Sequence, residues 1–212
     1  GIDQIQVNSQ TGLTFANGLR SILRQDPNIV MVGEIRDEET AKIAVNAALT
    51  GHLLLSTLHT NDAATALPRL MDMDVEPFLI ASTINIIIGQ RLVRKICSDC
   101  RVKNKLSVSE MASLGQSLGQ NIPKELKEGK DVFYAGKGCA TCTNTGYLGR
   151  IGIHEVIEMT EAVREAVMAR LNASEIKKIA RNEGMTTMFE DGFQKVLKGV
   201  TTIDELLRVM HE

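Results

Sequence analysis

The sequence predicts an α/β protein that is built on a parallel sheet and continues into a cysteine-containing arm and a helical C-terminal part. Two observations indicate the sheet. The aliphatic run at 29–32 has the composition of a strand that is buried on both faces, as the strands of parallel sheets are, and a second strand is expected at 53–57. Segments with helical periodicity precede, separate and follow these runs, which is the alternation of a parallel α/β fold.

The first two helices have recognisable ends. Thr14 should cap the first helix, and Asp26-Pro27 should end it because the residue before a proline avoids the helical conformation. Asp37 should cap the second helix, whose acidic first turn suits the positive end of the helix dipole, and Gly51 should close it. The apolar face of the first helix consists of Phe15, Leu19, Ile22 and Leu23.

Prolines locate the next elements. Pro68 is tolerated only in a first helical turn, which places the start of a third helix at about Thr65. Pro77 suits the first position of a fourth helix, which we expect to extend to Ile88. A strand at 91–96 should then lead to the first pair of cysteines.

The rest of the chain combines a polar segment, a strand and helices. Residues 101–130 are polar, with a helical pattern at Val108, Met111 and Leu114 that is typical of an insertion or arm. A strand is expected at 150–157, and helices follow it. Their expected boundaries are N-caps at Thr160 and Ser174, ends at Gly184 and Gly199, and a capping box at 202–205.

These elements divide the chain into three expected parts. Residues 1–96 form the α/β core, and residues 97–145 form a four-cysteine zinc-binding arm. Residues 146–212 form a strand and a helical C-terminal subdomain.

Length and charge restrict the function. A chain of 212 residues can bury one large core or two small ones, and its net charge of −2 gives no overall field that would attract nucleic acid or a membrane surface. Tryptophan is absent and aromatic residues make up 3%, so base-stacking platforms are not expected. No apolar run approaches the roughly 20 residues of a spanning helix, and no signal peptide is visible. Because the sequence begins with Gly1 and not with methionine, we expect a piece of a longer protein.

Four cysteines occur as two C-x-x-C pairs, Cys97 with Cys100 and Cys139 with Cys142. Each pair places two thiolates on one turn, and two such turns complete a closed tetrahedral zinc site, whose role should be structural. The segment between the pairs exceeds the roughly 15–20 residues of a zinc ribbon, but doubling a loop costs only about 0.6 kcal/mol. Disulfides, a redox dithiol and unmodified thiols are the alternatives. Zinc is favoured because two paired motifs rarely arise by accident in a chain without a secretion signal.

Polar side chains follow both aliphatic runs. Gly33 and Glu34 come directly after the first run, and Thr57 and His59 end the second. If the two strands are neighbours, these side chains converge at the carboxyl edge of the sheet, where α/β proteins bind ligands. Glu34 would serve a magnesium-bound or attacking water and His59 a terminal phosphate, as phosphoryl transfer requires. The alternative is a surface turn in which Glu34 and Arg36 form a solvated ion pair of little energy.

Longer motifs carry a resemblance to a known family. They are VGEIRD at 32–37, STLHTND at 56–62, QRLVR at 90–94, the two cysteine pairs and GYLGR at 146–150. With these motifs the chain resembles the secretion-superfamily hexameric ATPases, and among them the assembly ATPases of type II secretion systems and type IV pili. The retraction ATPases of pili generally lack the four-cysteine insertion and are less similar.

The resemblance implies the C-terminal part of a RecA-like P-loop NTPase domain that uses ATP and Mg²⁺, with a structural Zn²⁺ on the four cysteines. It makes Glu34 the acid of an atypical Walker B strand, and His59 the γ-phosphate contact of a histidine box. The other residues that it assigns to the nucleotide site are Gly33, His52, Thr57 and Arg150. The alternatives are a surface or capping histidine for His52 and a plain surface arginine at the start of a strand for Arg150.

One departure from the family pattern limits what the chain should do alone. The Walker A loop, G-x-x-x-x-G-K-[ST], is absent, as are the aspartate boxes and the N-terminal domain, which lie upstream in the family. Without this phosphate cradle, the chain alone should neither hold ATP well nor hydrolyse it.

The resemblance also implies a larger assembly. The full protein should form a homohexameric ring on the inner face of the bacterial cytoplasmic membrane, with a platform protein of that membrane and a cytoplasmic recruitment protein as partners and no nucleic acid. One alternative is a nucleic-acid translocase with the same type of sheet, which the near-neutral charge disfavours. The other is a zinc-stabilised interaction module without enzymatic activity.

Overall fold

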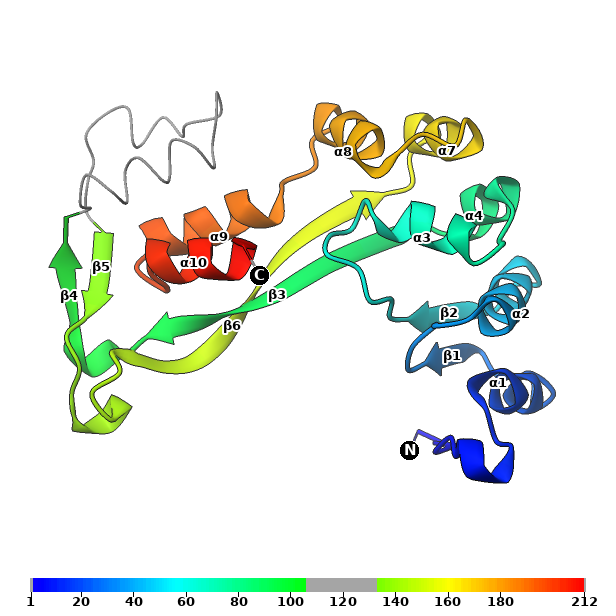
Figure 1. The fold of residues 1–212 in the computed structure, drawn as a ribbon, viewed down its shortest axis with the longest axis horizontal. Helices are drawn as coiled ribbons and strands as arrows, with labels where there is room; N and C mark the ends of the chain where they lie inside the picture. The colour runs from blue at the N-terminus through cyan, green and yellow to red at the C-terminus, as the bar shows by residue number, and fades with distance from the viewer. Residues whose placement is uncertain (1, 106–132, 212) are drawn as a thin grey trace. The chain divides into compact units, whose positions relative to one another are not determined.

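A computed structural model describes residues 2–105 and 133–211 (Figure 1). The helical pattern expected at Val108, Met111 and Leu114 lies outside these residues. The chain divides into two compact units, of which the first comprises Gly1–Ile88 with Val156–Met185 and the second Gly89–Glu155 with Thr186–Glu212. This division differs from the three consecutive parts expected from the sequence, because the chain leaves the first unit, builds most of the second and then returns.

The first unit contains a parallel pair of strands. β1 (Ile29–Val32) and β2 (Leu53–Ser56) are joined by helix α2 (Glu38–Leu49) and pair in parallel, with Val32 opposite Ser56. The predicted neighbourhood of the two strands is therefore confirmed. The expected burial on both faces is wrong for the described residues: Val30 is buried, but Met31 is 68% exposed, since described side chains cover only one face of the pair.

The predicted helix ends of this unit are largely confirmed. Helix α1 (Phe15–Leu23), which follows a short 3-10 turn at Ser9–Thr11, begins where the Thr14 side chain accepts a hydrogen bond from the Asn17 backbone N–H. Asp37 caps α2 by accepting from the backbone N–H of Thr40 at 2.8 Å. Helix α3 (Ala66–Asp72) holds Pro68 in its first turn, as expected.

The fourth helix is shorter than predicted. Helix α4 (Pro77–Thr83) begins at its proline, but strand β3 (Ile86–Ile96) occupies the positions that we expected to complete the helix as far as Ile88. Consecutive isoleucines are β-branched and favour an extended chain, and this preference outweighs the helical spacing. β3 pairs with β6 (Tyr147–Glu158), which runs in the opposite direction (Figure 1), and not with the parallel pair.

Two helices from late in the sequence complete the first unit. Helix α7 (Glu161–Met168) packs against α4, and α8 (Ala173–Asn182) packs against α7 (Figure 1). Thr160 caps α7 as predicted, but Ser174 lies inside α8, so that predicted cap is wrong. The cap is Asn172, because Asn is as good an N-cap as Ser and Glu175, three residues later, completes a capping box.

The second unit holds the cysteines and the last two helices. β4 (Arg101–Asn104) and β5 (Phe133–Gly136) form an antiparallel pair beside two 3-10 turns, Ser98–Cys100 and Ala140–Cys142. Helices α9 (Met188–Leu197) and α10 (Ile203–His211) lie side by side (Figure 1). The core of this unit includes Val93, Phe133, Ile153, Phe193 and Leu206.

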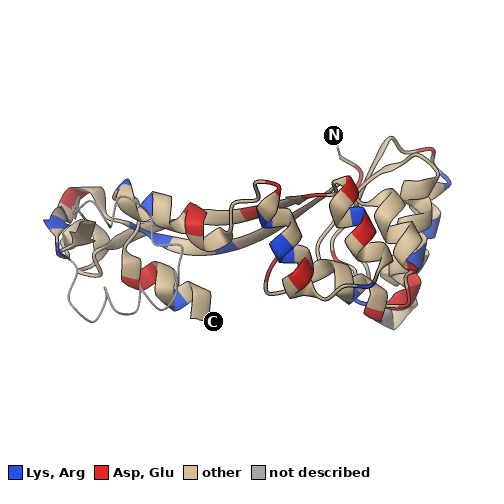
Figure 2. Cartoon of the chain, turned by 90° about the horizontal axis from the view of Figure 1, so that it is seen from above, with Lys and Arg blue, Asp and Glu red and all other residues tan. Residues whose placement is uncertain are grey.

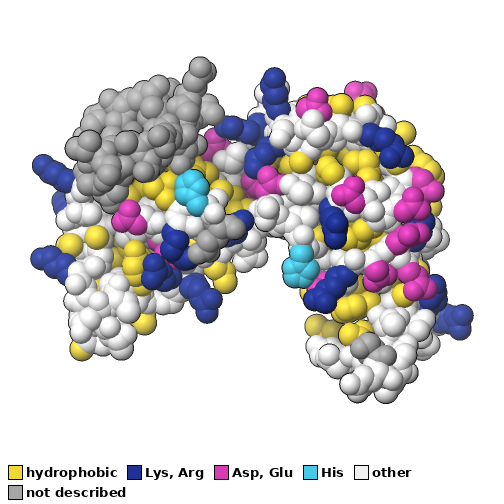
Figure 3. Space-filling model, viewed as in Figure 1, with side chains coloured by type: hydrophobic (Ala, Val, Ile, Leu, Met, Phe, Trp, Pro, Cys, Tyr) yellow, Lys and Arg dark blue, Asp and Glu magenta, His cyan; other side chains and the backbone are white. Residues whose placement is uncertain are grey.

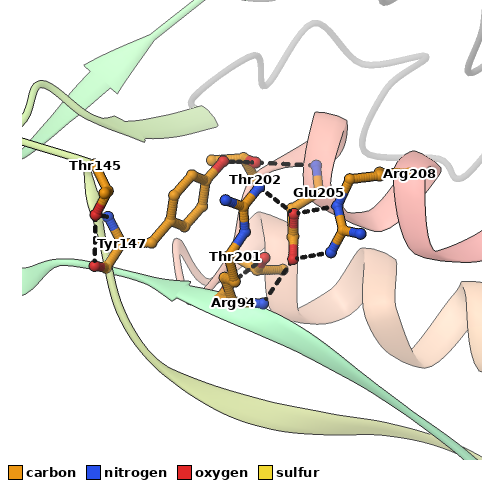
Figure 4. A network of polar contacts seen from close by, with 7 residues as sticks. All are labelled: Arg94, Thr145, Tyr147, Thr201, Thr202, Glu205 and Arg208. Atoms are coloured by element: carbon orange, nitrogen blue, oxygen red, sulfur yellow. Dashed lines mark hydrogen bonds and ion pairs between the residues drawn. The ribbon is translucent and has the colours of Figure 1, made fainter.

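A buried carboxylate links α10 to β3 (Figure 4). The Glu205 backbone N–H donates to Thr202 Oγ1 at 3.2 Å, which is one half of the predicted capping box. In a full capping box, the Glu205 carboxylate would accept from the backbone N–H of Thr202. Here it accepts from the backbone N–H of Arg94 and from the guanidinium groups of Arg94 and Arg208. Burial opposes its ionisation, but the hydrogen bonds from Arg208 and Arg94 outweigh burial and lower the pKa of Glu205 to about 2.

We predict that Glu205→Gln lowers the free energy of unfolding by about 2 kcal/mol at neutral pH, because the variant loses a buried charged acceptor. The pKa of this group falls from 4.5 to about 2 on folding, so its stabilisation is complete above 4.5 and is lost as the pH falls toward 2. The difference between variant and parent should therefore shrink over that range. Denaturant titrations at several pH values measure it.

Glu158→Gln is the matched control, because Glu158 is an exposed glutamate at the end of β6. It should change the unfolding free energy by less than about 0.5 kcal/mol. Equal losses in the two variants would contradict the role given to Glu205.

Candidate functional site

The carboxyl ends of the two parallel strands stay joined beyond the sheet. The backbone N–H of Ile35 donates to the carbonyl of Thr57 at 3.0 Å, and the Thr57 hydroxyl donates to the carbonyl of Gly33 at 2.7 Å. These bonds hold the turn after β1 against the turn after β2. The residues that follow the two strands therefore emerge side by side, as the sequence predicted.

Glu34 lies at the centre of this edge. Its Oε2 atom is 2.9 Å from His59 Nε2 and 2.6 Å from Arg36 Nε. The Glu34 side chain is 20% exposed, whereas those of Arg36 and His59 are 66% and 76% exposed. The hydrogen bond from His59 is the largest influence on the pKa of Glu34; with the contribution of Arg36 it outweighs burial and lowers that pKa. The site thus offers an ionised carboxylate with an accessible imidazole beside it.

Of the remaining predicted residues, His52 lies elsewhere in the first unit, and Arg150 belongs to the second unit. His52 precedes β2 and so lies at the opposite end of the strand from His59; its Nδ1 is 3.1 Å from the carbonyl of Ala47, at the close of α2. Arg150 lies on β6 in the second unit, where it lines an open hollow together with Arg94, Glu205 and Arg208.

The four cysteines lie together in the second unit, with all four sulfurs within 4.8 Å of one another. Sγ–Sγ distances are 3.8 Å for Cys97 and Cys139, 3.9 Å for Cys100 and Cys142, and 3.7 Å for Cys139 and Cys142. A disulfide needs about 2.0 Å, so the thiols here are free. Four sulfurs at about 2.3 Å from a tetrahedral zinc ion would be about 3.8 Å apart, so the cluster fits such an ion.

Two glycines allow the cysteine turns to meet. A Cβ atom on Gly136 would lie 2.1 Å from the carbonyl oxygen of Gly146, so neither position tolerates a side chain without movement of the backbone. The same Gly146 carbonyl accepts from the backbone N–H of Cys97 at 2.9 Å. Backbone N–H groups of Cys139 and Gly146 point at the sulfur of Cys142; although burial opposes ionisation, these bonds lower the pKa of Cys142 to about 6. The thiolate is the form that binds metal.

Charges of both signs are interspersed on the helices of both units (Figure 2). The face drawn in Figure 3 likewise mixes cationic, anionic and hydrophobic side chains. Neither view shows a large region with charges of one sign only. Among the described residues, no helix combines the length and the hydrophobicity that crossing a bilayer requires.

Sequence reasoning missed several ion pairs that join distant segments, and two of them matter for the site and the fold. Lys177 Nζ on α8 lies 2.9 Å from Asp62 Oδ2, near the start of α3, and Arg94 meets Glu205 as described above. No motif spacing connects such partners, so only the fold reveals them. Asp62 closes the STLHTND motif, which was the one available signal.

Comparison with known proteins gives the family. The family described as "Type II/IV secretion system protein" matches residues 1–208. The chain belongs to this family. Among curated relatives, the type IV pilus assembly ATPase PilB of Thermus thermophilus is 51% identical over 98% of this chain, and type II secretion system protein E of Aeromonas hydrophila is 46% identical over 100% of it. This secretion-family chain spans 22% and 40%, respectively, of those two relatives.

Solved structures support the same fold for this member of the secretion family. The Legionella pneumophila ATPase DotB has a TM-score of 0.60 and 23% identity, with 97% of this chain and 45% of that chain covered. The pilus retraction motor PilT with bound ADP has a TM-score of 0.61 and 23% identity, with 92% and 43% covered. The predicted α/β fold and the predicted family are confirmed.

Proposed function

We propose that the full-length protein is an ATP-hydrolysing motor that assembles pilin or pseudopilin subunits in a type II secretion or type IV pilus machine. The observation that carries this proposal is the contact between Glu34 and His59 at the carboxyl edge of two parallel strands. Ligands of open α/β sheets bind at such edges. Similarity over nearly the whole chain to proteins named as pilus assembly ATPases and secretion protein E supports it.

In this proposal, Glu34 orients the attacking water. Its lowered pKa keeps the carboxylate ionised at neutral pH, and Arg36 and His59 fix the position of Oε2. His59 is largely exposed and can reach a terminal phosphate, while Gly33 and Thr57 hold the strand ends together. Magnesium bound with ATP would neutralise the charge of the transferred phosphoryl group.

Further parts of the proposal rest on the family resemblance. The first unit is a RecA-like P-loop core whose Walker A cradle comes from outside these 212 residues. His52 and Arg150 are assigned to the nucleotide site in the complete ring. The ring is a homohexamer on the inner face of the cytoplasmic membrane, where it works with a platform protein and a recruitment protein.

The cysteine cluster is proposed to bind one structural zinc ion. All four positions of the tetrahedron are filled by sulfur, which leaves no open position for a substrate. The metal would join the turn before β4 to the turn before β6, and so would hold the base of the arm. This part of the proposal does not depend on ATP hydrolysis.

For the site, we predict that Glu34→Gln in the full-length protein reduces ATP hydrolysis by at least about 100-fold, because the amide cannot accept a proton or orient water as a carboxylate does. ATP binding and ring assembly should persist. Phosphate release, nucleotide binding and light scattering measure the three properties. Glu76→Gln removes an exposed carboxylate of the same unit and should be neutral. If Glu34→Gln retains hydrolysis, Glu34 has only a structural role.

For the metal, we predict about one zinc ion per chain in the purified full-length protein. Cys97→Ser and Cys142→Ser should each lose the zinc and lower the thermal midpoint, because metal binding contributes directly to folding. Elemental analysis and thermal unfolding with and without a chelator provide the measurements. Absence of zinc together with two disulfides would overturn this assignment.

A further inference from the structure

His59 lies on the segment that joins β2 to α3. Thr57 holds the strand side of this segment to Gly33 and Ile35, and the side next to α3 is anchored separately. Ala63 and Ala64 are 1% and 0% exposed, so the part next to α3 is packed into the core of the first unit. The Thr60 hydroxyl donates to the carbonyl of Asp62 at 3.0 Å. His59 itself remains exposed at the start of the segment. Its position therefore depends on how the buried part is held as well as on the bonds of Thr57.

Asp62 is the polar centre of this anchor. Its Oδ1 accepts from the backbone N–H of Thr65 at 2.9 Å and from the Thr65 hydroxyl at 2.5 Å. Its Oδ2 accepts from Lys177 Nζ at 2.9 Å. The side chains of Asp62 and Lys177 are 29% and 31% exposed, so the ion pair is partly shielded from water. Burial opposes ionisation, but the bonds from Thr65 and Lys177 prevail and lower the pKa of Asp62.

Lys177 comes from a helix that is itself fixed to the first unit. Ile176 and Ala180, on either side of it in α8, are buried in the core. The capping box of Asn172 and Glu175 fixes the start of α8. The ammonium group therefore approaches Asp62 from a rigid support.

We propose that Lys177 is a positioning residue for His59. Its ion pair with Asp62 ties α8 to the segment that follows β2, and so keeps the His59 imidazole within reach of Glu34. The role assigned to Lys177 is to act through Asp62 and not on the reacting atoms. The inference rests on the proposed function, because it takes His59 as a phosphate contact.

The kinetic test compares two neighbouring lysines of α8 in the full-length protein. Lys177→Met keeps the length of the side chain and removes its charge, and should lower kcat for ATP about fivefold while KM stays within about twofold, as expected for an interaction used in the transition state. Lys178→Met is the control, because Lys178 is exposed on the same helix, and it should leave both constants unchanged. Lys177→Arg retains the charge and should restore most of the activity.

A second measurement does not require hydrolysis. Amide hydrogen exchange over residues 58–65 of the full-length protein should be about threefold to tenfold faster in Lys177→Met, because the loss of a partly shielded ion pair favours local opening. Lys178→Met should exchange like the parent. Asp62→Asn weakens the same contact from the other side and should also speed exchange. The inference can therefore be tested with Asp62→Asn if the Lys177→Met variant fails to fold.

Exchange at 58–65 that matches the parent in both Lys177→Met and Asp62→Asn would overturn the inference. An unchanged kcat in Lys177→Met, with Glu34→Gln inactive, would overturn it as well. Failure of the proposed function is seen separately, as hydrolysis retained in Glu34→Gln.

Discussion

The parallel pairing of β1 with β2 is the constraint on which the candidate site depends. Because Val32 lies opposite Ser56, the turns that follow the strands meet, and Glu34 reaches His59 although the two are 25 positions apart in sequence. A register slip of one residue would turn each side chain of the strand to the opposite face. It would bury the exposed Ile29 and Met31 and would expose Val30. The bonds among Gly33, Ile35 and Thr57 act beyond the strands and hold the same register at the edge itself.

The cysteine cluster also brings distant residues together through backbone contact, but it does so through two glycines and not through strand pairing. Cys97 and Cys139 are 42 positions apart, and they meet because the Gly136 and Gly146 backbones pass in contact. Neither arrangement depends on the other: one lies in the first unit and uses strand pairing, and the other lies in the second unit and uses glycine contact. If the cluster binds the proposed zinc ion, loss of that ion should therefore reduce the stability of the second unit without removing Glu34 from His59.

Local signals in the sequence predicted local structure well. Thr14, Asp37 and Thr160 are caps because a side-chain oxygen satisfies a free N–H within the same turn, and that relation is visible in sequence. Prediction failed where two local signals competed, as in the run that ends at Ile88, or where the answer lay in distant packing. The ion pair between Lys177 and Asp62 could not be predicted, because no motif or spacing near either residue indicates its partner. The exposed face of β1 was likewise unpredictable, since aliphatic composition does not say how many layers cover a strand.

Burial distinguishes the proposed catalytic carboxylate, Glu34, from a structural one, Glu205. Glu34 and Glu205 each accept from two cationic or imidazole side chains, and the pKa of each is lowered. The Glu205 side chain is fully buried, so loss of its arginine partners would leave its charge without solvation by water. The partners of Glu34 are mostly exposed to water, which can take over their hydrogen bonds at little cost. In the proposed mechanism, this solvation lets His59 contact a terminal phosphate without leaving Glu34 uncompensated, whereas the buried charge of Glu205 depends on Arg94 and Arg208.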